Sequence, residues 1–202
     1  MKNIKALAAA AFISSAALIS IPVAAQDAGF YAGGAIGQSR LSGACDGLTI
    51  ACDDKDTAWK LFGGYQFNKY FGLEAGYADL GKASAAGVIA GTAVSAEVKA
   101  KGWEFLGVGT IPFTDKLSGY GKLGLVKWDV DAYSSAALGG SIATGSSSDD
   151  GTAATYGLGL KYDFAKNVGT RLEWQRYSNI GNDATTGQGD VNLYSVGIVI
   201  KF

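Results

Sequence analysis

Large apolar side chains alternate with small or polar ones over the last thirteen residues of the chain, Asp190 to Phe202. One set of alternate positions holds Tyr194, Val196, Ile198, Ile200 and Phe202. The other set holds Leu193, Ser195, Gly197, Val199 and Lys201. A period of two is that of a β-strand, because successive side chains point to opposite faces of a sheet. Either a soluble sheet buries the apolar face, or a transmembrane barrel turns it toward lipid and keeps small and polar groups inside.

Short and long breaks in this alternation follow one another strictly along the chain. Each short break follows an aromatic residue and precedes a new alternating run, as a tight hairpin turn does. The short breaks are Phe67–Tyr70, Phe113–Lys116 and Phe164–Asn167. The long breaks, interpreted as irregular loops, lie near residues 40–56, 79–95, 131–152 and 178–190. Three short and four long connections separate eight strands and leave both chain ends on the short-turn side.

This arrangement predicts an all-β fold: an eight-stranded antiparallel up-and-down transmembrane β-barrel with short periplasmic turns and long extracellular loops. Alternation also predicts two aromatic girdles on the outer face, one at each membrane interface. The girdle residues are Trp59, Tyr65, Phe67, Tyr77, Tyr156, Tyr162, Phe164 and Tyr194. The alternative is that these aromatics are scattered through a soluble core, since β-strands favour aromatic residues in any setting.

Charged residues fall on the opposite, inward face of the predicted strands. The inward cations are Lys60, Lys122, Lys161, Arg171 and Lys201, and the inward anions are Glu74, Glu104, Asp163 and Glu173. Eight strands enclose a space that side chains can fill, and buried charges persist only when paired. We therefore expect a closed, salt-bridged interior in preference to an open pore, with Glu74 and Arg171 as the pair to test.

The first 25 residues have the features of a secretory signal peptide. Two lysines precede an apolar run from Ala6 to Ile21, and small residues, Val23 to Ala25, precede Gln26. The alternative is a retained membrane anchor. Residues 1–25 are thus the expected signal peptide and residues 26–202 one barrel domain. After the signal no run of 18 apolar residues occurs, which argues against a helical membrane span.

Composition narrows the function further. Without the two signal lysines the chain has 15 basic and 18 acidic residues, a net charge of −3, so no nucleic-acid partner is expected. Cys45 and Cys52 are the only cysteines. In an oxidising exported compartment a disulfide between them is more natural than two free thiols.

The residues present offer little chemistry for catalysis. The chain has no histidine, which excludes a histidine-based triad and leaves the cysteine pair without further zinc ligands. The acidic pair Asp149–Asp150 and the acidic group at 53–56 fit solvated loops better than calcium sites, because they lack EF-hand spacing. No catalytic, cofactor-binding or metal-binding residues are predicted, no cofactor is expected, and the protein is expected not to be an enzyme.

Three segments resemble the outer-membrane protein A barrel family. These are Gly63–Tyr77 with Leu80–Gly81, Pro112–Asp115, and Arg171–Gly181. The resemblance covers essentially the whole predicted mature chain. The sequence departs from the two-domain members of the family by ending at the last predicted strand, so we do not expect the wall-anchoring role of their peptidoglycan-binding domain to carry over. The cysteine pair lies outside the motifs that carry the resemblance.

The resemblance implies a barrel in the outer membrane of a Gram-negative bacterium. It implies an interior charge network of Glu74, Glu104, Lys122, Lys161, Arg171 and Glu173. It also implies outer-membrane lipids, periplasmic chaperones and the barrel-assembly machinery as partners, a C-terminal assembly signal at Phe202, and a monomer. The expected function is a structural contribution to the cell envelope.

Three other functions remain open at this point. The exposed loops suit an adhesin that binds a host or surface ligand, because a rigid scaffold tolerates variation in its loops. A narrow, low-conductance pore is the second. The third, a soluble ligand-carrying barrel of the lipocalin type, needs an apolar interior and a polar exterior, which is the reverse of the predicted faces.

Overall fold

The structure is a computed structural model that describes residues 28–43, 45, 51–89, 91–138, 141–182 and 184–202. The signal peptide expected at residues 1–25 lies outside these residues. Within the described part, the chain forms no helix long and apolar enough to cross a membrane.

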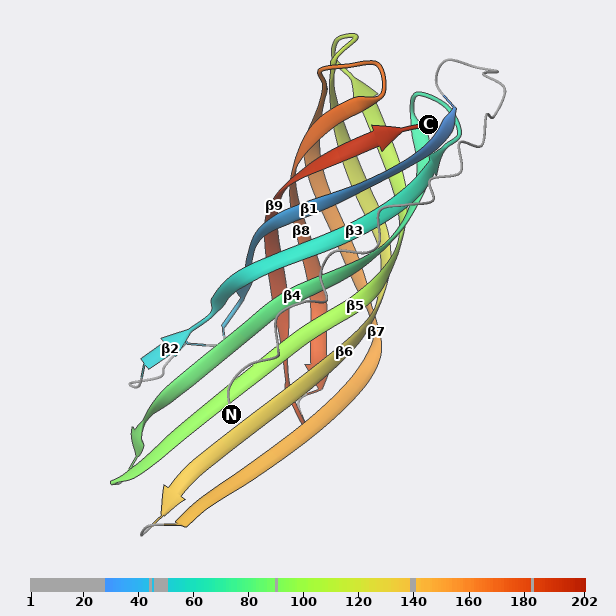
Figure 1. Ribbon diagram of the computed structural model, residues 1–202. Coiled ribbons are helices and arrows are strands. Elements are labelled where there is room, and N and C mark those ends of the chain that lie inside the picture. Colours follow the sequence, from blue (N-terminus) through green and yellow to red (C-terminus); the bar gives the residue numbers. More distant parts are fainter. Residues whose placement is uncertain (1–27, 44, 46–50, 90, 139–140, 183) are drawn as a thin grey trace, which may run out of the picture.

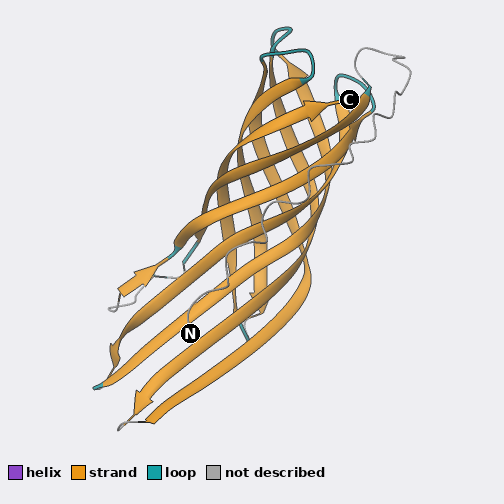
Figure 2. Cartoon of the chain, viewed as in Figure 1, coloured by secondary structure: helices purple, strands orange, loops and turns teal. Residues whose placement is uncertain are grey.

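The described residues form one antiparallel sheet that closes on itself (Figures 1 and 2). The strands are β1 (Gly29–Leu41), β2 (Ala51–Asp53), β3 (Lys55–Gln66), β4 (Phe71–Ile89), β5 (Thr92–Pro112), β6 (Leu117–Leu138), β7 (Ser141–Asp163), β8 (Val168–Asn182) and β9 (Gly187–Lys201). The short β2 lies beside β4 only. The other eight form a ring that is closed where β1 pairs with β9, so the predicted eight-stranded barrel is confirmed.

The three tight turns occur at residues 67–70, 113–116 and 164–167, as predicted. In the first, the Asn68 side chain accepts hydrogen bonds from the backbone N–H groups of Tyr70 and Phe71. In the second, the Thr114 hydroxyl accepts in the same way from the N–H of Leu117. Side-chain acceptors of this kind favour turns because they satisfy backbone groups that the ladder leaves free.

The interpretation of 79–95 and 131–152 as irregular loops is wrong. Most of 178–190 is also strand, because the β8–β9 ladder continues to Asn182 and Gly187. Strands β4 and β5 remain paired as far as Ile89 and Thr92, and β6 and β7 as far as Leu138 and Ser141. Ladder hydrogen bonds join backbone groups, so Ser-, Gly- and Ala-rich segments can continue a ladder without an apolar face. The result is two long β-hairpins that extend beyond the rest of the barrel (Figure 1).

A β-bulge between Asp79 and Lys82 marks the point where β4 leaves the barrel wall and enters its hairpin. Gly81 lies in this bulge with a φ of 72°. A Cβ at this position would lie 2.8 Å from the carbonyl oxygen of Thr57. Both the positive φ and the close backbone contact favour glycine here.

The two faces of the wall have the predicted inverted distribution of polarity. Exposed outward residues include Leu61, Leu73, Leu125, Leu158, Leu172 and Ile198. Inward residues such as Lys60, Glu104 and Glu173 are at most 5% exposed. Because a lipocalin-type barrel needs the opposite distribution, that alternative is excluded.

Candidate functional site

The interior of the barrel contains a cluster of six buried charged side chains. Lys60, Lys122 and Arg171 provide three positive charges, and Glu74, Glu104 and Glu173 provide three negative charges, so the cluster is neutral. They come from strands β3, β4, β5, β6 and β8, so the cluster spans the lumen. Alternation along each strand turns all six inward.

Glu173 lies between the two lysines. Its Oε1 lies 2.5 Å from Lys60 Nζ and its Oε2 lies 2.7 Å from Lys122 Nζ. Lys122 Nζ also lies 2.6 Å from Glu74 Oε1. Lys60 lies 3.6 Å from Glu104 and donates a short hydrogen bond to the Gln175 side chain. Each of these charges therefore has an opposite charge within contact distance, which offsets the cost of removing it from water.

The structure places the predicted pair Glu74 and Arg171 in direct contact. The two terminal guanidinium nitrogens of Arg171 donate to the two carboxylate oxygens of Glu74, at 2.9 and 3.4 Å. The guanidinium carbon also lies 3.4 Å from the centre of the Phe62 ring. Arginine suits this position because its planar group can bind a carboxylate with two hydrogen bonds while stacking on an aromatic face.

Three inward tyrosines complete the polar cluster. Tyr31 donates to Glu74 at 3.1 Å, Tyr120 donates to Glu173 at 2.8 Å, and Tyr177 donates a short hydrogen bond to Glu104. The Tyr120 ring lies over the inward face of Gly159, where a Cβ would come within 2.4 Å of the ring. Glycine on one strand therefore makes room for the aromatic ring from another.

Lys161, the sixth member of the predicted network, lies outside the cluster. It faces Arg171 directly across the β7–β8 ladder. Like charges that face each other across a ladder repel, so the Lys161 side chain lies instead near Asp163 at 3.8 Å. Lys201 binds the same carboxylate at 2.6 Å and joins this smaller group, which lies beside the last tight turn.

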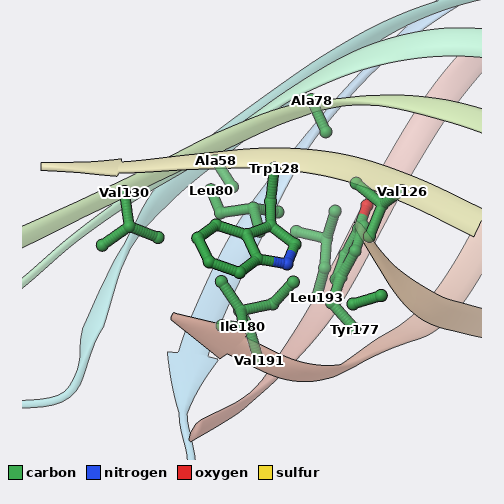
Figure 3. Close-up of a cluster of buried hydrophobic side chains, with 11 residues drawn as sticks. Ala58, Ala78, Leu80, Val126, Trp128, Val130, Tyr177, Ile180, Val191 and Leu193 are labelled. Carbon is green, nitrogen blue, oxygen red and sulfur yellow. The ribbon is translucent and has the colours of Figure 1, made fainter. Parts of the chain in front are cut away.

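An apolar layer fills the lumen on the hairpin side of the charged cluster. Trp128 lies across the interior and packs with Leu80, Val130, Ile180 and Val191, which point toward one another from different strands (Figure 3). The remaining buried members are Ala58, Ala78, Val126, Ala153, Tyr177 and Leu193. Two layers thus fill the lumen along the barrel axis: the charged cluster, and the apolar layer on its hairpin side.

The predicted girdle residues all lie on the outer face. Contacts join the rings of Trp59, Tyr77 and Trp103 on the hairpin side, with centroids 5.8 and 5.2 Å apart. On the turn side, Tyr65 lies 4.8 Å from Phe30 and 5.3 Å from Phe67. The remaining girdle residues, Tyr156, Tyr162, Phe164 and Tyr194, are each at least 40% exposed.

The spacing of the girdles agrees with the thickness of a bilayer. Trp59 and Phe67, Tyr156 and Phe164, and Tyr194 and Phe202 are each eight positions apart. At a rise of about 3.3 Å per residue and a tilt of about 40°, that separation spans roughly 20 Å along the barrel axis. The apolar band of outer-membrane barrels is about 25 Å tall, so the two belts lie where the lipid interfaces are expected.

The remaining predicted residues lie outside the lumen. Cys45 and Cys52 form a disulfide at the start of β2, on the hairpin side. Phe202 follows β9 and is 74% exposed on the lipid-facing side of the wall. Among the residues that the structure describes, no three carboxylates or cysteines are grouped so that they could hold a metal ion.

Part of the site was missed from the sequence. The alternation of β3 predicts that Lys60 points inward but does not join it to the network, whereas the structure shows it in contact with Glu173 and Glu104. The apolar layer around Trp128 was not foreseen either. Its signal was present in the alternation of β6, where Tyr120, Lys122, Val126, Trp128 and Val130 share one face.

Over residues 25–202 the chain matches the family model described as OmpA-like transmembrane domain. The chain belongs to this family. An OmpA-like barrel is an outer-membrane protein, and this chain is accordingly located in the outer membrane. The predicted resemblance, fold and location are confirmed together.

Relatives of this OmpA-like barrel include outer membrane protein A of Yersinia pseudotuberculosis, 34% identical over 185 residues, which are 89% of this chain and 50% of the relative. Outer membrane protein A of Salmonella typhi is 34% identical over 142 residues, 70% of this chain and 39% of the relative. The chain thus spans half the length or less of these relatives.

Solved structures with the same fold are more distant in sequence. Ail, the attachment invasion locus protein of Yersinia pestis, superimposes with a TM-score of 0.56 at 19% identity, over 86% of this chain and 99% of Ail. The N-terminal β-barrel domain of Pseudomonas aeruginosa OprF gives a TM-score of 0.51 at 15% identity, over 88% of this chain and all of that domain.

Proposed function

We propose that this OmpA-like barrel is a closed, non-enzymatic structural element of the outer membrane that contributes to envelope integrity. The observation that carries the proposal is the neutral lumen cluster, in which Lys60, Lys122, Glu74, Glu104 and Glu173 have side chains only 1% exposed. Water and ions need exposed polar groups along a path, and these are all engaged with one another.

The outward band and the girdles would bind lipid, which is the partner that an exposed apolar surface of this kind requires. The barrel-assembly machinery and periplasmic chaperones are proposed as the partners that bring it there, with Phe202 as part of the recognised C-terminus. A monomer is proposed because the ring is closed, so it has no sheet edge at membrane depth for another copy to extend.

Conductance and barrier function test the proposal together. In planar bilayers the purified protein should give no steady ion current, whereas regular conductance steps would favour the narrow pore. In cells, deletion of the gene should raise sensitivity to detergent and to chelators, and expression of the wild-type chain should restore resistance. An unchanged barrier in the deletion strain would contradict a structural role.

A second candidate function is attachment through the two projecting hairpins. Residues 141–154 of β7 pair with β6 only, because the β7–β8 ladder begins at Thr155. Within the described structure, one backbone edge of this segment thus has no partner strand. An unpaired edge can add a strand from another protein, so an extended peptide segment is the ligand that we propose.

Charge argues against an anionic polysaccharide ligand. Ail, which shares the fold, has been solved with the heparin analogue sucrose octasulfate. In the present chain Lys82 and Lys99 lie 2.9 and 3.1 Å from Glu97, and Lys101 lies 3.8 Å from Asp131. The two carboxylates offset all but one of the three lysine charges, so these lysines do not form the free basic patch that a sulfated ligand needs.

A shortened hairpin separates attachment from the structural role. Val130 and Asp149 face each other across the β6–β7 ladder, so residues 131–148 can be replaced by Asn-Gly, a two-residue hairpin turn. The attachment function predicts loss of binding to host cells or matrix while the barrel stays folded. Equal binding by the shortened and full-length proteins would leave only the structural role.

A further inference from the structure

Beyond the apolar layer the barrel opens toward the exterior as a cup of about 320 Å³. The larger apolar lining residues are Leu41, Leu80, Val98, Val130, Ile180 and Val191, and they come from six strands around the ring. Leu80, Val130, Ile180 and Val191 form the floor and are only 2% to 5% exposed. Figure 3 shows these four side chains around Trp128.

The shape of the cup is fixed by the wall. Backbone ladders hold the lining strands at fixed spacing, because Leu41 lies opposite Val191 across β1 and β9, and Val98 lies between Ala83 of β4 and Ala132 of β6. Strands joined in this way cannot move together to bring these side chains into contact, unlike the side chains of a soluble core. The floor also has no continuation, because Trp128 and the charged cluster fill the lumen beneath it. The cup therefore suits a molecule that binds and leaves by the same mouth.

The rim of the cup determines the charge of such a molecule. Among the described residues, two charged side chains line the cup, and each contacts an opposite charge: Asp54 contacts Arg40 at 2.8 Å, and Lys82 contacts Glu97 at 2.9 Å. Gln188 and Thr186 add neutral polar groups to the lining. The Thr186 hydroxyl accepts a hydrogen bond from the N–H of Asn182, and the Gln188 side-chain nitrogen donates to the carbonyl oxygen of Gly181, which leaves the Gln188 side-chain oxygen as an acceptor. In the described part of the chain, the lining thus offers hydrocarbon, amide and hydroxyl groups, and each of its two charged side chains already contacts an opposite charge.

We propose that this cup binds a small, uncharged molecule that has an apolar body and one polar group. The body would rest on Val130, Ile180 and Leu80, and the polar group would face Gln188 and Thr186. Small-molecule sites of about 300 Å³ and above are mostly apolar with a few placed polar groups, and this cup is at the lower end of that range. The inference goes beyond a structural role, since a barrel closed to ions can still hold such a ligand.

Benzyl alcohol is a suitable probe because it is neutral, water-soluble and has one hydroxyl on an aromatic body. The full-length mature protein is placed in lipid nanodiscs with labelled isoleucine methyl groups, and the probe is titrated by NMR. Ile180 reports the cup, and outward Ile198 reports partition of the probe into lipid. We expect the Ile180 shift to saturate and the Ile198 shift to grow linearly.

Two alanine substitutions give a matched test. Ala100 lines the cup, whereas Ala154 is exposed on the outer face of β7. The Ala100→Phe side chain should fill the cup and weaken binding at least tenfold, whereas Ala154→Phe should leave it unchanged. Heat-dependent electrophoretic mobility checks that both variants fold. Linear shifts at Ile180 in the wild type, or unchanged saturation in folded Ala100→Phe, would overturn the proposal.

Discussion

Replacing Arg171 by methionine removes a buried cation but keeps most of the side-chain volume. The variant loses two hydrogen bonds to Glu74 and the stacking contact with Phe62. It also leaves three buried carboxylates against two lysines. Breaking a buried pair by removing one partner costs about 3–5 kcal/mol, because the remaining charge is left without full compensation.

Urea unfolding in lipid vesicles, followed by the mobility difference between folded and unfolded protein, measures this cost. With a urea dependence of about 1–3 kcal/mol per molar, the midpoint of Arg171→Met should fall by roughly 1–5 M. An Arg171→Met midpoint equal to that of the wild type would refute the view that the cluster stabilises the barrel.

Two further variants separate charge compensation from packing. Glu74→Gln combined with Arg171→Met leaves two lysines and two carboxylates, so the cluster is again neutral. The double variant should be more stable than the sum of the two single effects predicts, by about 1–3 kcal/mol of coupling. Lys82→Met removes an exposed pair with Glu97 and should leave the midpoint unchanged, because water screens such pairs.

Three other perturbations test separate parts of the structure. Tyr120→Phe removes the hydroxyl that donates to Glu173 and should cost about 1.5–3 kcal/mol in the same urea assay. Gly81→Ala should cost about 1–3 kcal/mol, because its φ of 72° and the nearby backbone both disfavour a Cβ. At Asp190, the backbone N–H of Asn179 and the nearby Arg176 guanidinium hold the carboxyl pKa below its usual 3.8. This stabilisation is therefore present above the unfolded pKa and is lost as the pH falls through the lower folded value, so amide exchange at Asn179 should quicken there.

Each of these three perturbations has a matched control variant. Tyr194→Phe removes a hydroxyl on the outer face and should not alter the midpoint. Gly91→Ala shares a positive φ, 82°, but a Cβ there meets nothing within 4 Å, so it should cost less than Gly81→Ala. Asp190→Asn should remove the acid dependence of exchange at Asn179. Equal costs at the two glycines, or an acid effect that survives in Asp190→Asn, would contradict the corresponding explanation.

The sequence was sufficient to predict the fold and the inward or outward direction of most side chains. A barrel strand has only two faces, so the parity of a position determines whether a residue such as Glu104 or Leu158 meets lumen or lipid. The three tight turns and the four long breaks together then predicted the strand count. Neither step needed any knowledge of contacts between strands far apart in the sequence.

Contacts within the lumen could not be predicted in the same way. Parity puts Lys161 and Arg171 on the same face, but only the register shows that they oppose each other and that Lys161 must turn toward Asp163. The hairpins were missed for another reason. Side chains in 131–152 carry no apolar alternation, and the hydrogen bonds that hold that ladder belong to the backbone.

The filling of the lumen has a consequence for leakage. Changes in pH, salt concentration or applied voltage act on ionic contacts. They have little effect on an uncharged indole ring that is packed among aliphatic side chains. A path for ions therefore requires Trp128 to swing aside at the moment when the carboxylates and amines below it separate. Since both openings must occur together, agents that disturb only one of the two layers leave the barrier shut.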